Sequence, residues 1–225
     1  SNVSLFLLFT DLKKAFDSVA RAFLNRVLQS RCPPPLATIL AFLHQKAKLF
    51  FQGETTETDS GVLQGNTLAA LLFVWIMDEI LREWERRKNK DWGIKICFRK
   101  GETFKEFRPH DWEHLSSIET LEILLNWLGF ADDVIFVSTS GAEILEAFLL
   151  FVEICFSVGL EVNFSKCGLM SMEWNKETKE SLEVMIKKII PPHFPPLPIV
   201  KEYTYLGVLI SETGTYGEHV RLRSQ

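Results

Sequence analysis

Short apolar runs that end in carboxylates constrain the fold of this chain more than any other feature. Residues 5–10 are almost wholly apolar and end at Asp11, and apolar runs at about 122–130 and 134–138 flank the sequence Ala131-Asp132-Asp133. Runs of this length bounded by polar residues are typical of buried strands. Ionised carboxylates are rarely placed at the ends of such strands unless something compensates their charge.

This pattern allows two interpretations. Carboxylates that meet at adjacent strand ends repel one another without a cation, and hard oxygen ligands of this kind suit Mg²⁺, which completes its shell with waters and substrate phosphates. Alternatively, Asp132 and Asp133 belong to an ordinary hairpin turn and Asp11 caps a helix. Spacing alone leaves both interpretations open.

The rest of the chain mixes helical and strand patterns without strict alternation. We expect a helix with Ser18 as its N-cap that runs through Val27, and a long helix from Asn66 or Thr67 to about Lys88. Further helices are expected at 36–43, 142–158 and 178–189. Strands are expected at 48–52, 55–59, 160–163 and 168–172, with a strand pair at 203–210. Residues 89–117 show no sustained period and predict an insertion, and the Pro-rich residues 191–198 predict an extended segment. The pattern favours an α+β fold with a mostly antiparallel sheet.

Composition limits the class of protein. Of the 225 residues, 47% are apolar, which excludes a disordered tail. No apolar run reaches the roughly 18 residues that span a bilayer, no signal peptide opens the chain, and the four cysteines lack C-x-x-C spacing. We therefore expect an intracellular, soluble chain with no membrane partner; because Ser1 lies within an apolar run, we expect a piece of a longer protein.

The charge does not favour a general nucleic-acid binder, because the formal net charge is −4. Residues 82–105 are an exception, with nine Lys or Arg and four Asp or Glu, a net charge of +5. This segment either follows a phosphate backbone or is a solvated helix end and loop. The pair His110 and His114 has helical metal-ligand spacing, but it lies in the irregular stretch and is a weak candidate.

Five segments, in order, resemble motifs of reverse transcriptases. They are FTDLKKAFDSV at 9–19, GVLQG at 61–65, GFADDVI at 129–135, GLEVNFSK at 159–166 and YLG at 205–207. Each is weak alone, but five in this order are specific. The Lys-Ala-Phe-Asp and Tyr-Leu-Gly sequences resemble the non-LTR retrotransposon (LINE-type) enzymes most, and these are related to group II intron enzymes.

The resemblance implies a polymerase palm, an α+β domain with an antiparallel sheet flanked by helices. It implies a reverse transcriptase core at 1–190 with the insertion at about 89–117, followed at 191–225 by a Pro-rich connection and a primer-grip-like strand pair. The implied activity is RNA-directed DNA polymerisation, in which two Mg²⁺ ions (or Mn²⁺) support transfer of deoxynucleotides to a primer 3′-hydroxyl. The implied partners are an RNA template, a DNA primer and deoxynucleoside triphosphates, in the nucleus or cytoplasm.

The resemblance also implies roles for single residues. Asp11, Asp132 and Asp133, with the backbone carbonyl of Leu12, would hold metal; Lys166 would protonate pyrophosphate; Phe16, Gln64 and Gly65 would contact the nucleotide; and Tyr205, Leu206 and Gly207 would hold the primer. For three of these residues a simpler interpretation stays open: Phe16 as a core aromatic, Lys166 as a solvated loop lysine and Gly207 as a plain tight turn.

One departure from the family pattern leaves the activity open. After Gln64-Gly65 the usual Asp-Pro-x-Ser-Pro is replaced by NTLAA at 66–70. One alternative is therefore a decayed or domesticated palm that only binds nucleic acid or protein. Another is an RNA-dependent RNA polymerase, against which Phe16, Ala131 and Gln64-Gly65 argue. Since the motifs for fingers and thumb are lacking, we expect the chain alone to extend a primer poorly.

Overall fold

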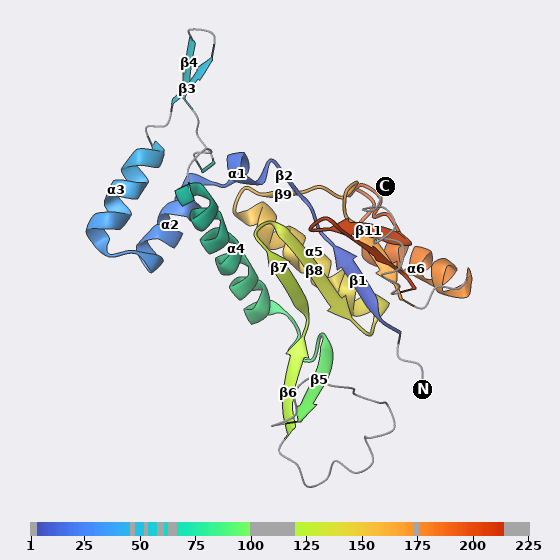
Figure 1. The fold of residues 1–225 in the computed structure, drawn as a ribbon. Coiled ribbons are helices and arrows are strands. Elements are labelled where there is room, and N and C mark those ends of the chain that lie inside the picture. Colours follow the sequence, from blue (N-terminus) through green and yellow to red (C-terminus); the bar gives the residue numbers. More distant parts are fainter. Residues whose placement is uncertain are drawn as a thin grey trace, which may run out of the picture.

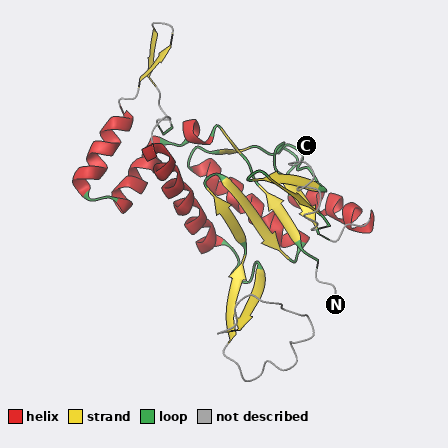
Figure 2. Ribbon diagram, viewed as in Figure 1, coloured by secondary structure: helices red, strands yellow, loops and turns green. Residues whose placement is uncertain are grey.

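The computed structural model describes most of the chain. The described residues are 4–45, 48–51, 54–57, 61–62, 67–99, 120–172 and 176–213. Helices and antiparallel strands are mixed, so the expected α+β class is confirmed (Figures 1 and 2). None of the described helices combines the length and apolar character that crossing a membrane requires.

The elements follow one another with little strict alternation. The helices are α1 (Ala15–Ser18), α2 (Arg21–Arg31), α3 (Pro34–Gln45), α4 (Thr67–Arg87), α5 (Gly141–Ser157) and α6 (Lys176–Ile189). The strands are β1 (Phe6–Phe9), β2 (Leu12–Lys13), β3 (Lys48–Phe51), β4 (Glu54–Glu57), β5 (Ile94–Arg99), β6 (Thr120–Leu125), β7 (Trp127–Phe130), β8 (Asp133–Ser138), β9 (Glu161–Val162), β10 (Gly168–Ser171), β11 (Glu202–Tyr205) and β12 (Val208–Ser211).

A four-stranded antiparallel sheet in the order β10-β1-β8-β7 forms the centre of the fold. Strand β1 is apolar along its whole length because both of its faces are covered. Leu8 belongs to the large core that α4 and α5 form with the sheet, whereas Phe9 belongs to a smaller core on the opposite face. Tyr203 of β11 stacks on Phe9 there, with ring centroids 4.2 Å apart. The strand is thus fixed from both sides just before Asp11.

Helices α4 and α5 pack on the sheet and on each other (Figure 1). The indole of Trp84 is buried between them and donates a hydrogen bond of 2.8 Å to the carbonyl of Ala147. Phe136 of β8 meets Phe151 of α5 edge to face, with ring centroids 5.3 Å apart. Buried aromatic pairs of this kind contribute about 0.5–1.5 kcal/mol beyond their area. The helices therefore hold the sheet rigidly behind the strand ends.

The prediction that Ser18 caps a helix is wrong. Ser18 is the last residue of α1, and its hydroxyl donates a hydrogen bond of 2.9 Å to the carbonyl of Lys14. Helix α2 begins only at Arg21, since the N–H of Ala20 donates instead to the carbonyl of Val158, at 2.9 Å. This long-range bond keeps the chain extended where the local pattern predicts a helix.

Two further expectations need correction. The irregular stretch expected at 89–117 contains strand β5, which pairs with β6 from Ile94↔Leu125 to Arg99↔Thr120; its alternation is too short to stand out in the sequence. The Pro-rich segment is not wholly extended, because the N–H of Phe194 donates to the carbonyl of Pro191 at 3.1 Å in a turn. That turn lets the Phe194 ring stack on Phe164, with centroids 5.1 Å apart.

Residues 100–119, which include His110 and His114, lie outside the described residues.

Candidate active site

The pairing of β1 with β8 brings Asp11 and Asp133 to the same end of the sheet. Phe9 lies opposite Ile135 in the antiparallel register. Thr10 continues the pairing, because both its N–H and its hydroxyl donate to the carbonyl of Val134, each at 2.9 Å. One further step of this register places Asp11 opposite Asp133. The carboxylates of Asp11 and Asp133 therefore belong to neighbouring strand ends, as the first of the two interpretations assumes.

Asp132 reaches the same place through the turn between β7 and β8. Phe130 and Asp133 are the last pair of this hairpin, so Ala131 and Asp132 form the connection. Ala131 has a φ of 55°, a left-handed conformation that costs a non-glycine residue free energy. Phe130 is 65% exposed, which leaves its ring at the surface beside the carboxylates.

The three carboxylates interact electrostatically. Burial, and after it the negative charges of Asp132 and Asp11, raise the pKa of Asp133 above its usual value. Among the residues that the structure describes, no positive group lowers the pKa of this carboxyl. Such uncompensated repulsion at a strand end is the chemistry that a divalent cation relieves.

The opposite wall of the site comes from β9 and the loop after it. In the antiparallel pairing of β2 with β9, Leu12 lies opposite Val162 and Lys13 lies opposite Glu161. The side chains of Lys13 and Glu161 also form an ion pair. Asn163 follows directly and bonds to Asp11 through its side-chain amide, at 3.0 Å, and through its backbone N–H, at 2.8 Å.

A cavity of about 450 Å³ opens at this wall. Besides Asp11, Leu12 and Asn163, its lining includes three lysines, Lys13, Lys14 and Lys166. Positive side chains beside a carboxylate fit a ligand that carries several negative charges. The structure thus places Lys166 on the wall of the same cavity as Asp11.

Strands β11 and β12 are tied to the same site by two tyrosines. The hydroxyl of Tyr203 donates to the carbonyl of Lys166 at 2.9 Å, and that of Tyr205 donates to the carbonyl of Asp133 at 3.3 Å. Burial, followed by the charges of Cys167, Asp11 and Asp133, raises the pKa of Tyr203 to about 12, so it remains a neutral donor. The β11–β12 hairpin is therefore fixed relative to the carboxylates.

The tip of that hairpin is a tight turn with positive φ at both central residues. Tyr205 pairs with Val208, and between them Leu206 has a φ of 49° and Gly207 a φ of 75°. Turns of this geometry prefer Asn-Gly, so a leucine at the first position is strained. Leu206 is also half exposed.

Left-handed non-glycine residues gather at this site. Among the residues that the structure describes, three have this conformation: Lys14, Ala131 and Leu206. Lys14 lines the cavity, Ala131 precedes the carboxylate pair and Leu206 lies at the tip of the hairpin that the tyrosines hold. Strained backbone often marks positions kept for function rather than for stability.

Phe16 packs against helix α4. It is partly buried and stacks on the fully buried Phe73, with ring centroids 4.4 Å apart. The segment that precedes the Gln64-Gly65 motif is fixed close by, since Val62 N–H donates to the carbonyl of Phe16 at 2.6 Å. Gln64 and Gly65 themselves lie outside the described residues.

Four of the nine basic residues of the segment 82–105 form ion pairs within the fold. Arg82 is 2.9 Å from Asp78, Arg86 is 2.8 Å from Glu83, Arg87 is 2.6 Å from Glu153 and Lys88 is 3.5 Å from Glu85. These pairs support the interpretation of a solvated helix end over that of a phosphate-binding track.

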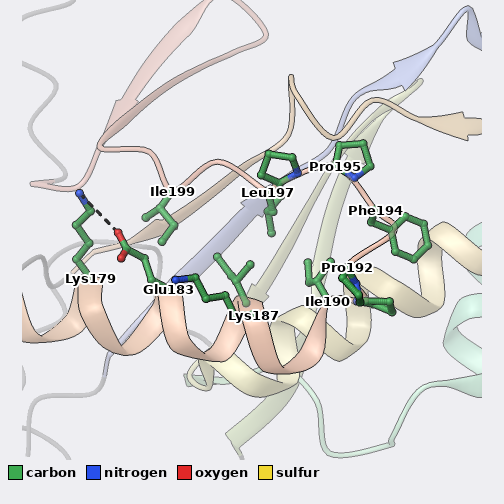
Figure 3. A pocket seen from close by; sticks show the side chains of 12 residues that line it. Lys179, Glu183, Lys187, Ile190, Pro192, Phe194, Pro195, Leu197 and Ile199 are labelled. Carbon is green, nitrogen blue, oxygen red and sulfur yellow. Dashed lines mark ion pairs between the residues drawn. The ribbon is translucent and has the colours of Figure 1, made fainter.

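A cavity of about 500 Å³ lies elsewhere, between α6 and the Pro-rich segment (Figure 3). Its walls are mostly apolar, with Ile190, Phe194 and Leu197 among them. The carboxylate of Glu183 at its rim is 3.8 Å from the ammonium group of Lys179. This cavity lacks the convergent carboxylates of the β1–β8 end, so we place the candidate chemistry at the smaller cavity.

The carboxylate site fits a metal in its donor chemistry. Within the described residues, no group of three or more His, Cys, Asp or Glu side chains lies close enough together to hold a metal ion by itself. Mg²⁺ does not need three protein ligands, because it is usually bound by one or two carboxylates and completes its shell with waters and substrate phosphates. Asp11, Asp132 and Asp133, whose charges already repel one another, are suitable donors.

Comparison with known proteins agrees with the motif order. Residues 2–210 match the family model for reverse transcriptase (RNA-dependent DNA polymerase). The chain belongs to the reverse transcriptase family. No curated protein matches the sequence of this reverse transcriptase domain.

Solved structures of two Candida telomerases are similar to the domain. Apo telomerase from Candida tropicalis, truncated from its C-terminal domain, has 10% identity and a TM-score of 0.48 over 94% of this chain and 34% of that chain. Telomerase from Candida albicans, in complex with the TWJ fragment of telomeric RNA, has 12% identity and a TM-score of 0.48 over 94% of this chain and 31% of that one. The chain therefore spans about a third of the length of these structures.

Two residues of the site were not predicted as functional from the sequence. Asn163 lies within the Gly-Leu-x-x-Asn-x-x-Lys segment, so the motif itself carried a signal for it. Tyr203 lies two residues before Tyr205, on the same face of β11, and this period-2 spacing was its only signal.

Proposed function

We propose that the domain is the catalytic palm of an RNA-directed DNA polymerase that transfers deoxynucleotides to a primer 3′-hydroxyl. The observation that carries the proposal is the meeting of Asp11 and the Asp132-Asp133 turn at one end of the central sheet in a chain of the reverse transcriptase family. Their repulsion, which raises the pKa of Asp133, indicates a site that is built for a cation and not for stability.

Asp11, Asp132 and Asp133, with the backbone carbonyl of Leu12, would hold Mg²⁺, or Mn²⁺ in its place. When bound, a pair of such ions supplies Lewis-acid stabilisation for an in-line displacement at a phosphate. The chain's own part is to hold the carboxylates. Thr10 fixes the strand before Asp11 through two bonds to Val134, and the Tyr205 hydroxyl fixes the backbone at Asp133.

The lysine-lined cavity is the proposed place of the nucleoside triphosphate. Lys14 and Lys166 lie on its wall beside Asp11, while Lys13 is paired with Glu161. Lys166 would donate a proton to the departing pyrophosphate, which needs a positioned acid. The bond from Tyr203 to the carbonyl of Lys166 fixes the backbone of this lysine.

Phe16 would select the sugar. Its ring is immobilised against Phe73, so it presents a fixed surface five residues after Asp11. A bulky ring beneath the incoming sugar leaves no room for a 2′-hydroxyl. Gln64 and Gly65 would complete the nucleotide side, where a glycine allows close backbone approach.

The β11–β12 turn would hold the primer end. Leu206 and Gly207 lie at its tip, and Tyr205 anchors it to the backbone at Asp133. We assign residues 1–190 to the palm core and 191–225 to the connection and this primer-binding hairpin. The Lys-Ala-Phe-Asp and Tyr-Leu-Gly sequences favour the non-LTR retrotransposon subtype, with RNA as template and a retroelement as the source.

A second candidate is a palm that has lost catalysis and only binds nucleic acid or a protein. The altered segment at 66–70, the net charge of −4 and the internal pairing of the basic segment favour it. An RNA-dependent RNA polymerase is a weaker third candidate, because Phe16 would exclude a ribose.

Primer extension on an RNA template separates the three. The protein that contains this domain is given Mg²⁺ and either deoxynucleotides or ribonucleotides, beside its Asp132→Asn variant. Extension with deoxynucleotides that the variant loses supports the proposal. Equal extension by parent and variant excludes the carboxylate site, no extension with retained primer–template binding favours the binding module, and a preference for ribonucleotides favours the RNA polymerase.

A further inference from the structure

Asn163, in the loop after β9, forms two hydrogen bonds to Asp11, one from its side chain and one from its backbone. Its side-chain Nδ2 donates to Asp11 Oδ2 at 3.0 Å, and its backbone N–H donates to the carbonyl of Asp11 at 2.8 Å. The same residue thus fixes both the main chain and the carboxylate of Asp11.

The amide of Asn163 is itself oriented. Ser165 Oγ donates to Asn163 Oδ1 at 2.8 Å. An asparagine amide has one accepting and one donating end, so a donor on its oxygen turns its NH₂ group toward Asp11. The N–H groups of Lys166 and Cys167 both donate to the carbonyl of Asn163, at 2.9 and 3.1 Å, and hold the loop in a tight turn around it.

The charge state of this contact matters as much as its geometry. A lysine or arginine in place of Asn163 would put a positive charge within hydrogen-bond distance of the Asp11 carboxylate, where it would compete with a metal cation. A neutral amide holds the carboxylate without cancelling its charge. The amide of Asn163 donates to Oδ2 of Asp11 and leaves the negative charge of this carboxylate available to a cation.

We propose that Asn163 is a positioning residue that orients the Asp11 carboxylate for metal binding, with Ser165 orienting Asn163 in turn. This inference rests on the proposed function, because it assumes that Asp11 is a metal ligand. Hydrogen-bond partners of metal-binding carboxylates typically change metal affinity by about 10- to 100-fold when they are removed.

The test measures metal binding directly, without turnover. Mn²⁺ is titrated into the full 225-residue chain, and free Mn²⁺ is followed by electron paramagnetic resonance. The variants are Asn163→Ala, Ser165→Ala and, as a matched control, Ser138→Ala. Ser138 lies at the far end of β8 and loses a comparable side-chain bond, 2.9 Å from its Oγ to Glu143 Oε2. Thermal unfolding without metal reports the integrity of each variant.

We expect Asn163→Ala to raise the dissociation constant for Mn²⁺ by about tenfold or more, Ser165→Ala to raise it by a smaller factor, and Ser138→Ala to leave it unchanged. If Asn163→Ala does not fold, the exposed Ser165→Ala carries the test. Equal affinities in the parent and in the folded Asn163 and Ser165 variants overturn this inference alone. A parent chain that binds no Mn²⁺ overturns the proposed metal site and this inference with it.

Discussion

Strain at Leu206 predicts that a substitution at the tip of the β11–β12 turn stabilises the protein. Leu206 has a φ of 49°, a conformation that costs an ordinary L-residue about 1–2 kcal/mol. Asparagine tolerates it far better and is the preferred residue at this turn position. Since asparagine keeps part of the cost, we expect Leu206→Asn to raise the free energy of unfolding by about 1 kcal/mol. For a chain of this size that corresponds to about 2–4 °C in Tm.

Gly207 provides the matched variant. Its φ is 75°, and a Cβ added there would meet nothing within 4 Å, so Gly207→Ala adds strain without a clash. We expect it to lower the free energy of unfolding by about 1 kcal/mol. Urea denaturation followed by tryptophan fluorescence measures both variants against the parent.

The two variants should move in opposite directions, and that contrast tests the reasoning. A Leu206→Asn variant that is no more stable than the parent, beside a destabilised Gly207→Ala, would show that packing of Leu206 outweighs its backbone strain. If the turn holds a primer, Leu206→Asn should also extend a primer more slowly although it is the more stable protein. Unchanged extension would remove Leu206 from the primer site.

Three further predictions address the carboxylates, the tyrosine anchor and the sugar. Asp133→Asn should raise the free energy of unfolding at neutral pH, because it removes a carboxylate whose charged form the fold disfavours. Since the pKa of Asp133 is raised in the folded state, protonation gives the parent the same gain as the pH falls through that pKa, and the parent and the variant should become equally stable in acid. A difference in the free energy of unfolding that persists in acid would refute the claim that repulsion at Asp133 is its cause. Tyr203→Phe removes the bond to the carbonyl of Lys166 and should cost about 1 kcal/mol in urea denaturation while slowing extension; loss of stability with full activity would separate the anchor from catalysis. Phe16→Val should raise ribonucleotide relative to deoxynucleotide incorporation in single-nucleotide assays, and unchanged selectivity would leave Phe16 a core residue against Phe73.

The central sheet and its carboxylate end could be predicted because they depend on local signals. The apolar run before Asp11 is continuous since both faces of β1 are covered, and the run around Asp133 has the length of a strand. The resemblance implied a role for Lys166 at the phosphates, and in the structure Lys166 lines the same cavity as Asp11.

Other features depend on contacts between distant segments and left little trace in the sequence. Ser18 has the right residue type for an N-cap, but the bond from Ala20 to Val158 delays the helix. The stacking of Tyr203 on Phe9 requires that β11 folds back over the sheet, which no periodicity of residues 202–205 reveals. Tertiary contacts of this kind override local propensity.

The most direct test of the account is single-turnover incorporation of one deoxynucleotide on an RNA template, with Mg²⁺, by the protein that contains this domain. Asp11→Asn and Asp132→Asn each remove one proposed metal ligand, and Ser138→Ala serves as the control outside the site. We expect loss of incorporation in both aspartate variants with the fold retained, and parental incorporation in the control. Parental rates in either folded aspartate variant would contradict the claim that these strand ends form the catalytic centre.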